Sequence, residues 1–264
     1  MFTIEKYVLA DSLEQAYELN QNKRNVIIGG MLWLKMGRKK IGTAIDLSSL
    51  GLNLIEEDED SFKIGCMCTL RDVETNNSLN HHFNDMFSKS LEHIVGVQMR
   101  NMATIGGSIY SRFGFSDILT ALLSLDCYVE LFKGGVVPLE KYVDMPRDND
   151  ILVKIIIKKD GRKVNYSSHR KSSADLPVLT CAVSNLGSMW NIVIGASPSK
   201  AKLSQFNLGE NPNEKQVDSM ISQVIGSTCF GTNLRGSKKY RQLLADVLVR
   251  RNIEMIIKGG KYAN

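Results

Sequence analysis

The chain has 264 residues, of which 43% are hydrophobic and 23% charged, so it can form one large domain or two ordinary ones with a substantial core. Its net charge of +5 is too small to indicate a nucleic-acid-binding protein by itself. No apolar run approaches the roughly 18 residues that a membrane-spanning helix needs. The first residues, MFTIEKYVLADSLEQ, lack a long apolar segment, so we expect no signal peptide there.

The cysteines Cys66, Cys68, Cys127, Cys181 and Cys229 are odd in number and scattered along the chain. This pattern predicts no disulfide framework and favours a reducing, cytoplasmic location. Cys66 and Cys68 form a C-x-C pair without a second pair, so we expect buried structural thiols and no metal or iron–sulfur site within this chain.

Strands and helices alternate along the first part of the chain. Periodicity predicts strands over residues 3–9, 26–28, 45–50, 62–68, 127–132 and 151–157. It predicts helices after the capping patterns at residues 11–14 and 69–72, and over residues 88–94 and 117–125. This mixture is typical of an α+β domain.

A charged, glycine-containing stretch, KKDGRK at residues 158–163, lies between apolar strands. We place a domain boundary there, which divides the chain into residues 1–160 and 161–264. Beyond it, VLTCAVSNL and NIVIGA predict an antiparallel pair of strands. Helices are predicted over residues 214–226 and 237–257, so the second domain is a small antiparallel sheet with helices.

Two glycine pairs, Gly29-Gly30 and Gly106-Gly107, lie between apolar residues. Glycine allows another group to approach its backbone, and successive N–H groups in such a segment can bind an anion. The alternative is that each pair simply forms a turn. Neither pair continues as G-x-G-x-x-G or as G-K-[ST], so neither is a Rossmann fingerprint or a P-loop.

The stretch RNMATIGGSIYSRFGFSDILTALLSLDCYVEL, from Arg100 to Leu131, resembles a flavin-binding segment of the FAD-binding (medium) subunits of molybdenum hydroxylases. This family includes the flavoprotein subunits of xanthine dehydrogenase and carbon monoxide dehydrogenase. NVIIGGMLWLKM with AIDLSSL resembles the family's first flavin segment, and SADLPVLTCAV, IGASP and KKYRQLLADVLVRRNIE resemble its C-terminal domain. The resemblance extends in order from about Val26 to Glu254.

The resemblance implies a two-lobed FAD-binding domain of the vanillyl-alcohol-oxidase-like (PCMH) type, with FAD between the lobes, followed by the C-terminal domain. FAD would be bound without a covalent link, because no histidine or cysteine is next to either glycine pair in the sequence. The implied cofactor-binding residues are Ile27, Ile28, Gly29, Gly30, Met31, Leu32 and Trp33 in the first segment, Ala103, Thr104, Gly106, Gly107, Ser108, Ser111, Ser116 and Asp117 in the second, and Leu152. The glycines would open N–H groups to the diphosphate, and Asp117 would accept hydrogen bonds from cofactor hydroxyls.

Three departures from the family pattern stand out. Met31-Leu32 replaces a polar pair such as Thr-Asp, so contact there would come from the backbone alone. Ser108 replaces an asparagine, and the segment from Arg112 to Phe115 replaces a proline-containing stretch. Ser167 lies near the register of a lysine that many members carry.

The family's arrangement implies an electron-transfer subunit with no general acid or base of its own. Its partners would be a small subunit with [2Fe-2S] clusters and a large subunit with the molybdenum cofactor, and NAD or another acceptor would take the electrons. The substrate, oxidised on the large subunit, would be a purine such as xanthine or another N-heterocycle. The basic segment 235–251 and the loop 112–115 are candidate partner surfaces.

Two other interpretations remain open from the sequence. A degenerate flavin subunit that has lost FAD is suggested by Met31-Leu32. A non-enzymatic basic binding module, for instance for nucleic acid, is suggested by the net charge and the basic C-terminal segment, but it leaves both glycine pairs unexplained.

Overall fold

The computed structural model describes residues 2–259, and its internal contacts divide the chain into two compact units. Unit 1 contains the chain up to Val73, Val97–Ser111 and Cys127–Ile157. Unit 2 contains Glu74–Gly96, Arg112–Asp126 and the chain from Lys158 onward. The domain limits predicted from the sequence stay a prediction. Within residues 2–259, no helix combines the length and the apolarity needed to cross a membrane.

Unit 1 begins with a small parallel sheet in the order β1-β3-β2. Its elements are β1 (Thr3–Leu9), α1 (Leu13–Asn20), β2 (Val26–Ile28), the short 3-10 helices η1 (Leu34–Met36) and η2 (Ser48–Leu50), and β3 (Lys40–Asp46). Ile28, Ile41 and Ala44 form its apolar cluster, against which Met31 packs. The strand predicted over residues 45–50 therefore lies earlier, because residues 48–50 turn into η2.

The second sheet of unit 1 has the order β4-β5-β8-β6-β7. Its strands are β4 (Ile55–Glu57), β5 (Ser61–Gly65), β6 (Cys127–Leu131), β7 (Gly135–Pro138) and β8 (Leu152–Lys158). The helices of this part are α5 (Val97–Arg100), α6 (Ile105–Ser111) and α8 (Leu139–Tyr142), and α2 (Leu70–Thr75) spans the limit of the unit. Thr69 and Asp72 cap α2 reciprocally, as the sequence predicts, with both hydrogen bonds within 3.0 Å.

Unit 2 is built on an antiparallel sheet in the order β12-β11-β10-β9. Its strands are β9 (Lys163–His169), β10 (Leu179–Leu186), β11 (Met189–Gly195) and β12 (Lys202–Asn207). Its helices are α3 (Asn77–His82), α4 (Met86–Leu91), α7 (Asp117–Leu123), α9 (Glu214–Ser227) and α10 (Lys238–Ile257). The predicted antiparallel pair of strands is confirmed, with Val183 opposite Ile192.

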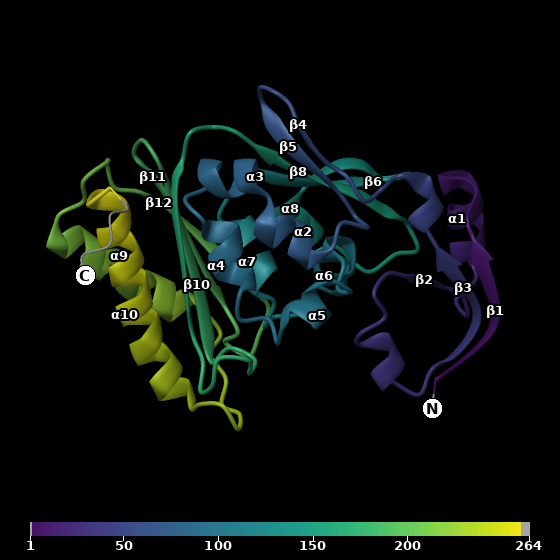
Figure 1. Cartoon of the computed structure of the whole chain (residues 1–264). Helices are drawn as coiled ribbons and strands as arrows, with labels where there is room; N and C mark the ends of the chain where they lie inside the picture. Colours follow the sequence, from purple (N-terminus) through teal and green to yellow (C-terminus); the bar gives the residue numbers. More distant parts are fainter. Residues whose placement is uncertain (1, 260–264) are drawn as a thin grey trace. The chain divides into compact units, whose positions relative to one another are not determined.

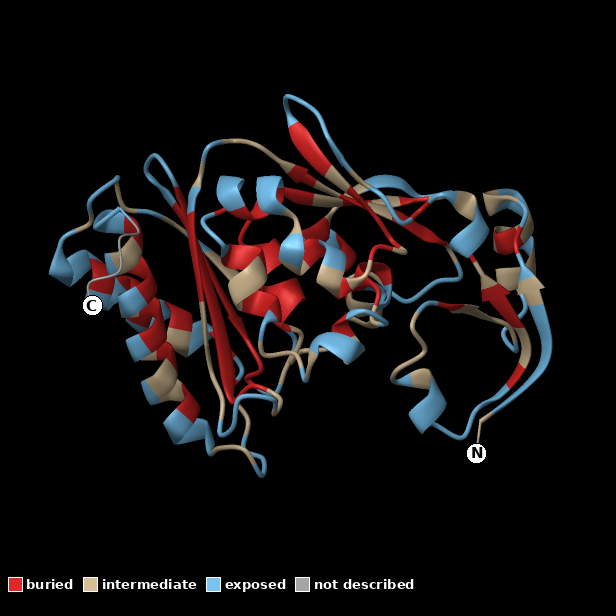
Figure 2. Ribbon diagram, viewed as in Figure 1, coloured by how far each residue is buried: buried red, intermediate tan, exposed pale blue. Residues whose placement is uncertain are grey.

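Helices cover both faces of this sheet. Figure 1 shows α9 and α10 on one side of β10, and α4 and α7 on the other. Because side chains alternate along a strand, Cys181 and Val183 enter the apolar core with α9 and α10, while Thr180 points to α7 and hydrogen-bonds Thr120 at 2.9 Å. Figure 2 shows the result, since the two central strands of this sheet, β10 and β11, are buried along most of their length.

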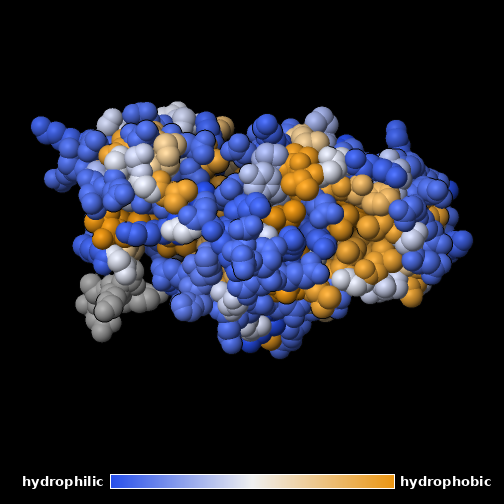
Figure 3. Space-filling view, turned by 90° about the horizontal axis from the view of Figure 1, so that it is seen from above, coloured by the Kyte–Doolittle hydropathy of each residue, from blue (hydrophilic) through white to orange (hydrophobic). Residues whose placement is uncertain are grey.

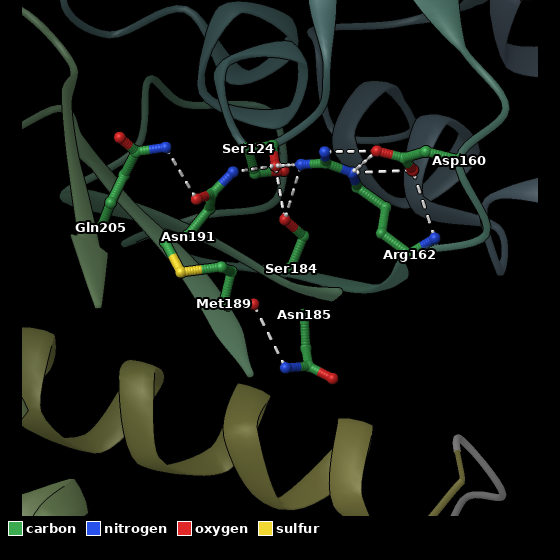
Figure 4. A network of polar contacts seen from close by, with 8 residues as sticks. All are labelled: Ser124, Asp160, Arg162, Ser184, Asn185, Met189, Asn191 and Gln205. Atoms are coloured by element: carbon green, nitrogen blue, oxygen red, sulfur yellow. Dashed lines mark hydrogen bonds and ion pairs between the residues drawn. The ribbon is translucent and has the colours of Figure 1, made fainter. Parts of the chain in front are cut away.

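A polar network fixes the C-terminal end of α7 (Figure 4). Three groups from the sheet side donate to the carbonyl oxygen of Ser124, the C-cap residue: Arg162 Nη1 at 2.9 Å, Asn191 Nδ2 at 3.2 Å, and Ser184 Oγ. Arg162 is also ion-paired with Asp160. Cationic and polar donors satisfy the free carbonyls at a helix C-terminus, so this network anchors α7 on the sheet.

The predicted fold class is confirmed at the level of mixed helices and sheets, with an antiparallel sheet in the C-terminal part. The two tryptophans differ in burial, since Trp33 has 48% of its surface exposed, whereas Trp190 is buried. Trp33 follows the first glycine pair in a short turn.

Candidate functional site

The first glycine pair allows two segments of unit 1 to approach closely. Gly29 and Gly30 follow β2 directly. A Cβ on Gly30 would lie 1.8 Å from the carbonyl oxygen of Met102, and one on Gly29 would lie 2.5 Å from Thr104 Oγ1. Any larger residue would push residues 102–104 away. The structure therefore brings together the two segments that the sequence singles out.

The second glycine pair lies in the first turn of α6. The N–H of Gly106 donates to the Cys66 carbonyl at 2.9 Å, and the N–H of Gly107 donates to Thr104 Oγ1 at 3.2 Å. A Cβ on Gly106 would lie 2.5 Å from the Cys66 carbonyl oxygen. The expectation that both pairs open N–H groups to a ligand is thus wrong for this pair. These glycines instead let α6 pack against the backbone of Cys66.

The first loop, which follows β2 and contains Gly30, Met31 and Leu32, differs from the second glycine pair. Its three N–H groups are not used as donors within residues 2–259. Among the hydrogen bonds of residues 2–259, none is donated by the N–H groups of Gly30, Met31 or Leu32. Met31 has a φ of 55°, in the left-handed region that non-glycine residues rarely occupy. Backbone strain of this kind clusters at functional sites, and successive N–H groups around a left-handed residue form an anion-binding concavity.

The Met31 side chain is occupied elsewhere, since it packs against the cluster of Ile28, Ile41 and Ala44. It therefore stabilises the small sheet, while its backbone forms the loop. The expectation that the first segment contacts a ligand through its backbone stays a prediction.

Most of the remaining predicted residues in unit 1 make hydrogen bonds at α6 or pack in the sheet. Ser108 Oγ donates to the Thr104 carbonyl at 3.0 Å, and Ser111 Oγ donates to the Gly107 carbonyl at 2.6 Å. The Ala103 carbonyl accepts from the N–H of Leu70 at 2.8 Å. Leu152 is buried in β8, opposite Leu131. Their contacts with a cofactor stay a prediction.

A cysteine lies beside the second glycine pair in space, although none is next to it in the sequence. Cys66 packs against Gly106, but its thiol is buried. Burial raises the pKa of this thiol to about 12, so it stays protonated and is a poor nucleophile. The other nearby cysteine, Cys68, is also buried, and burial raises its pKa to about 11.

Ser116 and Asp117 belong to unit 2, where they fix the start of α7. Ser116 is the N-cap, and its side chain accepts from the N–H of Leu119 at 3.3 Å. Asp117 is buried, and its Oδ1 accepts from the Tyr166 hydroxyl and from Arg170 Nη2, both at 2.5 Å. Tyr166 was not predicted from the sequence. An aspartate at a helix start within an otherwise apolar helix is the feature that indicates such buried partners.

Burial is the main influence on the electrostatics of this cluster. It raises the pKa of Asp117, while the Arg170 guanidinium and the Tyr166 hydroxyl oppose that rise. Burial, and then the Asp117 charge, raise the pKa of Tyr166 well above its ordinary value. Arg170 remains buried with its Nε unpaired. The cluster is therefore an internal ion pair with few groups left to bind a ligand.

The loop from Arg112 to Phe115 is held firmly in unit 2. The Gly114 carbonyl accepts from the N–H of Ala196 at 2.6 Å, and a Cβ on Gly114 would lie 2.0 Å from the Ser199 carbonyl oxygen. The rings of Phe113 and Phe115 stack with centroids 5.0 Å apart and an interplanar angle of 11°. Their predicted role as a partner surface is not tested by these contacts.

Taken together, these residues can bind an anionic group through backbone donors in unit 1. No group of His, Cys, Asp and Glu side chains within residues 2–259 has the arrangement of a metal site.

Comparisons with known proteins agree with this chemistry. Residues 2–159 match the family model of the FAD binding domain in molybdopterin dehydrogenase. The chain is 28% identical over 256 residues to the uncharacterized protein YgfM of Escherichia coli (strain K12), covering 93% of this chain and 94% of that one. It is 22% identical over 272 residues to the nicotine 6-hydroxylase medium subunit of Paenarthrobacter nicotinovorans, covering 94% and 95% of the two chains.

A similar fold occurs in carbon monoxide dehydrogenase from Hydrogenophaga pseudoflava, in a structure that lacks the Mo-pyranopterin moiety of its molybdenum cofactor. The TM-score is 0.85 at 19% identity, and the match covers 96% of this chain and 97% of that one.

Gly30→Ala tests the close approach of the two loops. The added Cβ must displace the Met102 carbonyl, so we expect the free energy of unfolding to fall by about 1–3 kcal/mol. Gly226→Ala is the matched control, because a Cβ there meets nothing within 4 Å and Gly226 lies inside α9. Chemical denaturation should show the control unchanged or slightly more stable. Equal stability of Gly30→Ala and wild type would mean that the loops are not in contact.

Arg170→Met tests the buried pair. Asp117 would be left as a buried, uncompensated charge, which costs about 3–5 kcal/mol at pH 7. Without its cation the carboxyl would have a still higher folded pKa, so protonation would relieve the cost and the loss should shrink as the pH falls from 7 towards 4. Arg235→Met, which removes a half-exposed partner of Asp175, should cost far less, and because Arg235 lowers the pKa of Asp175 this small loss should persist down to about pH 4. A pH-independent loss in Arg170→Met would exclude Asp117 as its cause.

Proposed function

The chain belongs to the family of FAD-binding domains in molybdopterin dehydrogenases, and we propose that it is the FAD-carrying electron-transfer subunit of a heteromeric molybdenum hydroxylase. In this proposal it passes electrons from iron–sulfur clusters on a partner subunit to NAD or another acceptor. The observation that carries the proposal is the first glycine loop, with its strained Met31 and the unused N–H groups of Gly30, Met31 and Leu32.

The residues of this loop fit the diphosphate of FAD. Its N–H groups would donate to the anionic oxygens, and a hydrogen bond to a charged group contributes roughly 1.5–3 kcal/mol net. Gly30 lets the loop lie against residues 102–104, which keeps the donors in a fixed arrangement. When bound, FAD supplies the redox chemistry, since its flavin exchanges electrons singly or in pairs. The chain's own residues bind and orient it.

The remaining residues divide into two roles in this proposal. The buried Thr104 and Gly106 support the loop from the start of α6, while Gly107 and Ser108, which are less buried, contact the cofactor. Ser116 and Asp117, which are committed to the start of α7, act as positioning residues for unit 2. This revises the direct contact with cofactor hydroxyls that the sequence suggested for Asp117.

The partners are proposed from the relatives. The medium subunit of nicotine 6-hydroxylase is by its name one of several subunits, and nicotine is an N-heterocycle. We therefore propose a small iron–sulfur subunit and a large molybdenum subunit as partners, with a substrate such as xanthine or another N-heterocycle oxidised on the large subunit. A cytoplasmic location, suggested by the cysteine pattern, belongs to the same proposal.

Flavin release tests the proposal directly. The purified chain should be yellow, and precipitation by acid or heat should leave FAD in the supernatant, because the cysteines near the glycine loops are buried and protonated. Gly30→Ala should lower the flavin content, and Gly226→Ala should leave it unchanged. Flavin that remains in the pellet would indicate a covalent link. A folded wild-type chain that takes up no FAD would instead favour the degenerate subunit.

A further inference from the structure

An exposed apolar row follows the outer face of α10. Tyr240, Leu243 and Val247 have 41%, 59% and 41% of their surfaces exposed. Their spacing of i, i+3 and i+7 places them on one helical stripe. The opposite face of α10 is already used, since Ala245, Leu248, Val249, Ile253 and Ile256 pack into the core of the unit 2 sheet. Tyr240 also contacts His169 of β9, through a hydrogen bond of 3.0 Å between its hydroxyl and His169 Nε2 and an edge-on ring contact, whereas Leu243 and Val247 are the more open part of the row.

Cations lie at both ends of this row. Lys239 lies beside Tyr240, and Arg251 continues the stripe at i+11. Neither side chain makes an ion pair among residues 2–259, whereas Arg250 is paired with Asp218 and Asp246. Lys239 and Arg251 are twelve positions apart, which corresponds to about 18 Å along the helix. Asp246 and Glu254 also lie beside this strip, at i+3 and i+11 from Leu243, but they are paired with Arg250 and Lys258, so Lys239 and Arg251 are the cations beside it that form no ion pair among residues 2–259.

The turn before α10 presents a further apolar side chain. Leu234 is 96% exposed, yet its turn is held tightly. The buried Arg241 donates to Asn233 Oδ1 at 2.6 Å and to the Gly231 carbonyl at 2.8 Å, and Lys171 donates to the Leu234 carbonyl at 3.1 Å. Holding an exposed leucine in a fixed turn lowers the ordering cost of binding a partner there.

Exposed apolar side chains also occur on unit 1, for example Ile4, Tyr7 and Leu9 on β1, and Figure 3 shows a broad apolar area among hydrophilic residues on the face drawn. Exposure alone therefore does not identify a docking surface. The α10 row differs by its regular spacing, its flanking free cations and the fixed turn beside it.

A second copy of this chain is a poor occupant of the row. Two α10 helices packed antiparallel would place Lys239 of each copy near Arg251 of the other, and parallel packing would place like residues together. Both arrangements bring cations into contact, which is costly at an interface. A partner that suits the row has an apolar strip with carboxylates about 18 Å apart.

We propose that the row formed by Tyr240, Leu243 and Val247, with Lys239, Arg251 and Leu234, docks an acidic partner subunit of the complex. This inference rests on the proposed function, because it takes the partner to be one of the iron–sulfur or molybdenum subunits. The apolar side chains supply the buried contact, in the manner of a helix laid into a groove. The cations select the acidic partner and set its direction along α10.

The test uses the full chain, tagged and purified with its partners from the native host. Leu243→Asp with Val247→Asp should lower the iron and molybdenum that co-purify by about tenfold or more, while the FAD content stays at the wild-type level. Leu54→Asp is the matched control, because Leu54 is exposed to the same 59% and lies in unit 1. A second variant, Lys239→Glu with Arg251→Glu, changes only exposed side chains and should also weaken the complex, most strongly at low salt.

Each outcome decides the proposal. Unchanged iron and molybdenum in both variants overturns the docking surface, as does a wild-type chain that carries FAD but no partner. If the wild-type chain is a dimer and the Leu243→Asp, Val247→Asp variant is a monomer, a second copy occupies the row. That result overturns the proposal of an acidic partner. A wild-type chain without FAD overturns the proposed function itself, which keeps the two failures distinct.

Discussion

The candidate site depends on the contacts of one hydroxyl group, that of Thr104. It accepts the N–H of Gly107 and lies where a side chain on Gly29 would otherwise stand. One side chain thus joins the strand-to-loop turn after β2 to the first turn of α6. Because Thr104 is buried, this contact is protected from water and fixes the distance between the loops. The contact with Thr104 accounts for Gly29, whereas Gly30 and Gly106 allow close packing against Met102 and Cys66.

The two units use different means to stabilise the segments that resemble the family. In unit 1, two backbone segments pack closely against one another. The Met31 side chain packs into the small apolar cluster and so holds the strained backbone of that residue in place. In unit 2 the helix α7 is anchored at both ends, by the Asp117–Arg170 pair at its start and by the donors to Ser124 at its end. Each unit therefore holds its own segment in a fixed conformation.

Much of this could be predicted from the sequence, and the failures have identifiable causes. Strands such as residues 3–9 and the antiparallel pair in unit 2 follow from alternation, and the capping pattern at Thr69 was recognisable. The sequence also identified the residues of both loops. It could not show that the N–H groups of Gly106 and Gly107 are used internally, because their acceptors, Cys66 and Thr104, are set by tertiary packing. For the same reason it could not identify Tyr166 and Arg170 as partners of Asp117, some fifty residues away.

The central claim is that the first loop binds the diphosphate of FAD and that the second supports it. Amide hydrogen exchange of the chain with and without FAD tests this most directly. The account predicts that FAD protects the amides of Gly30, Met31 and Leu32, whereas those of Gly106 and Gly107 are already protected without it. Protection that appears on FAD addition only at residues 106–108, with the amides of residues 30–32 unchanged, would contradict the account.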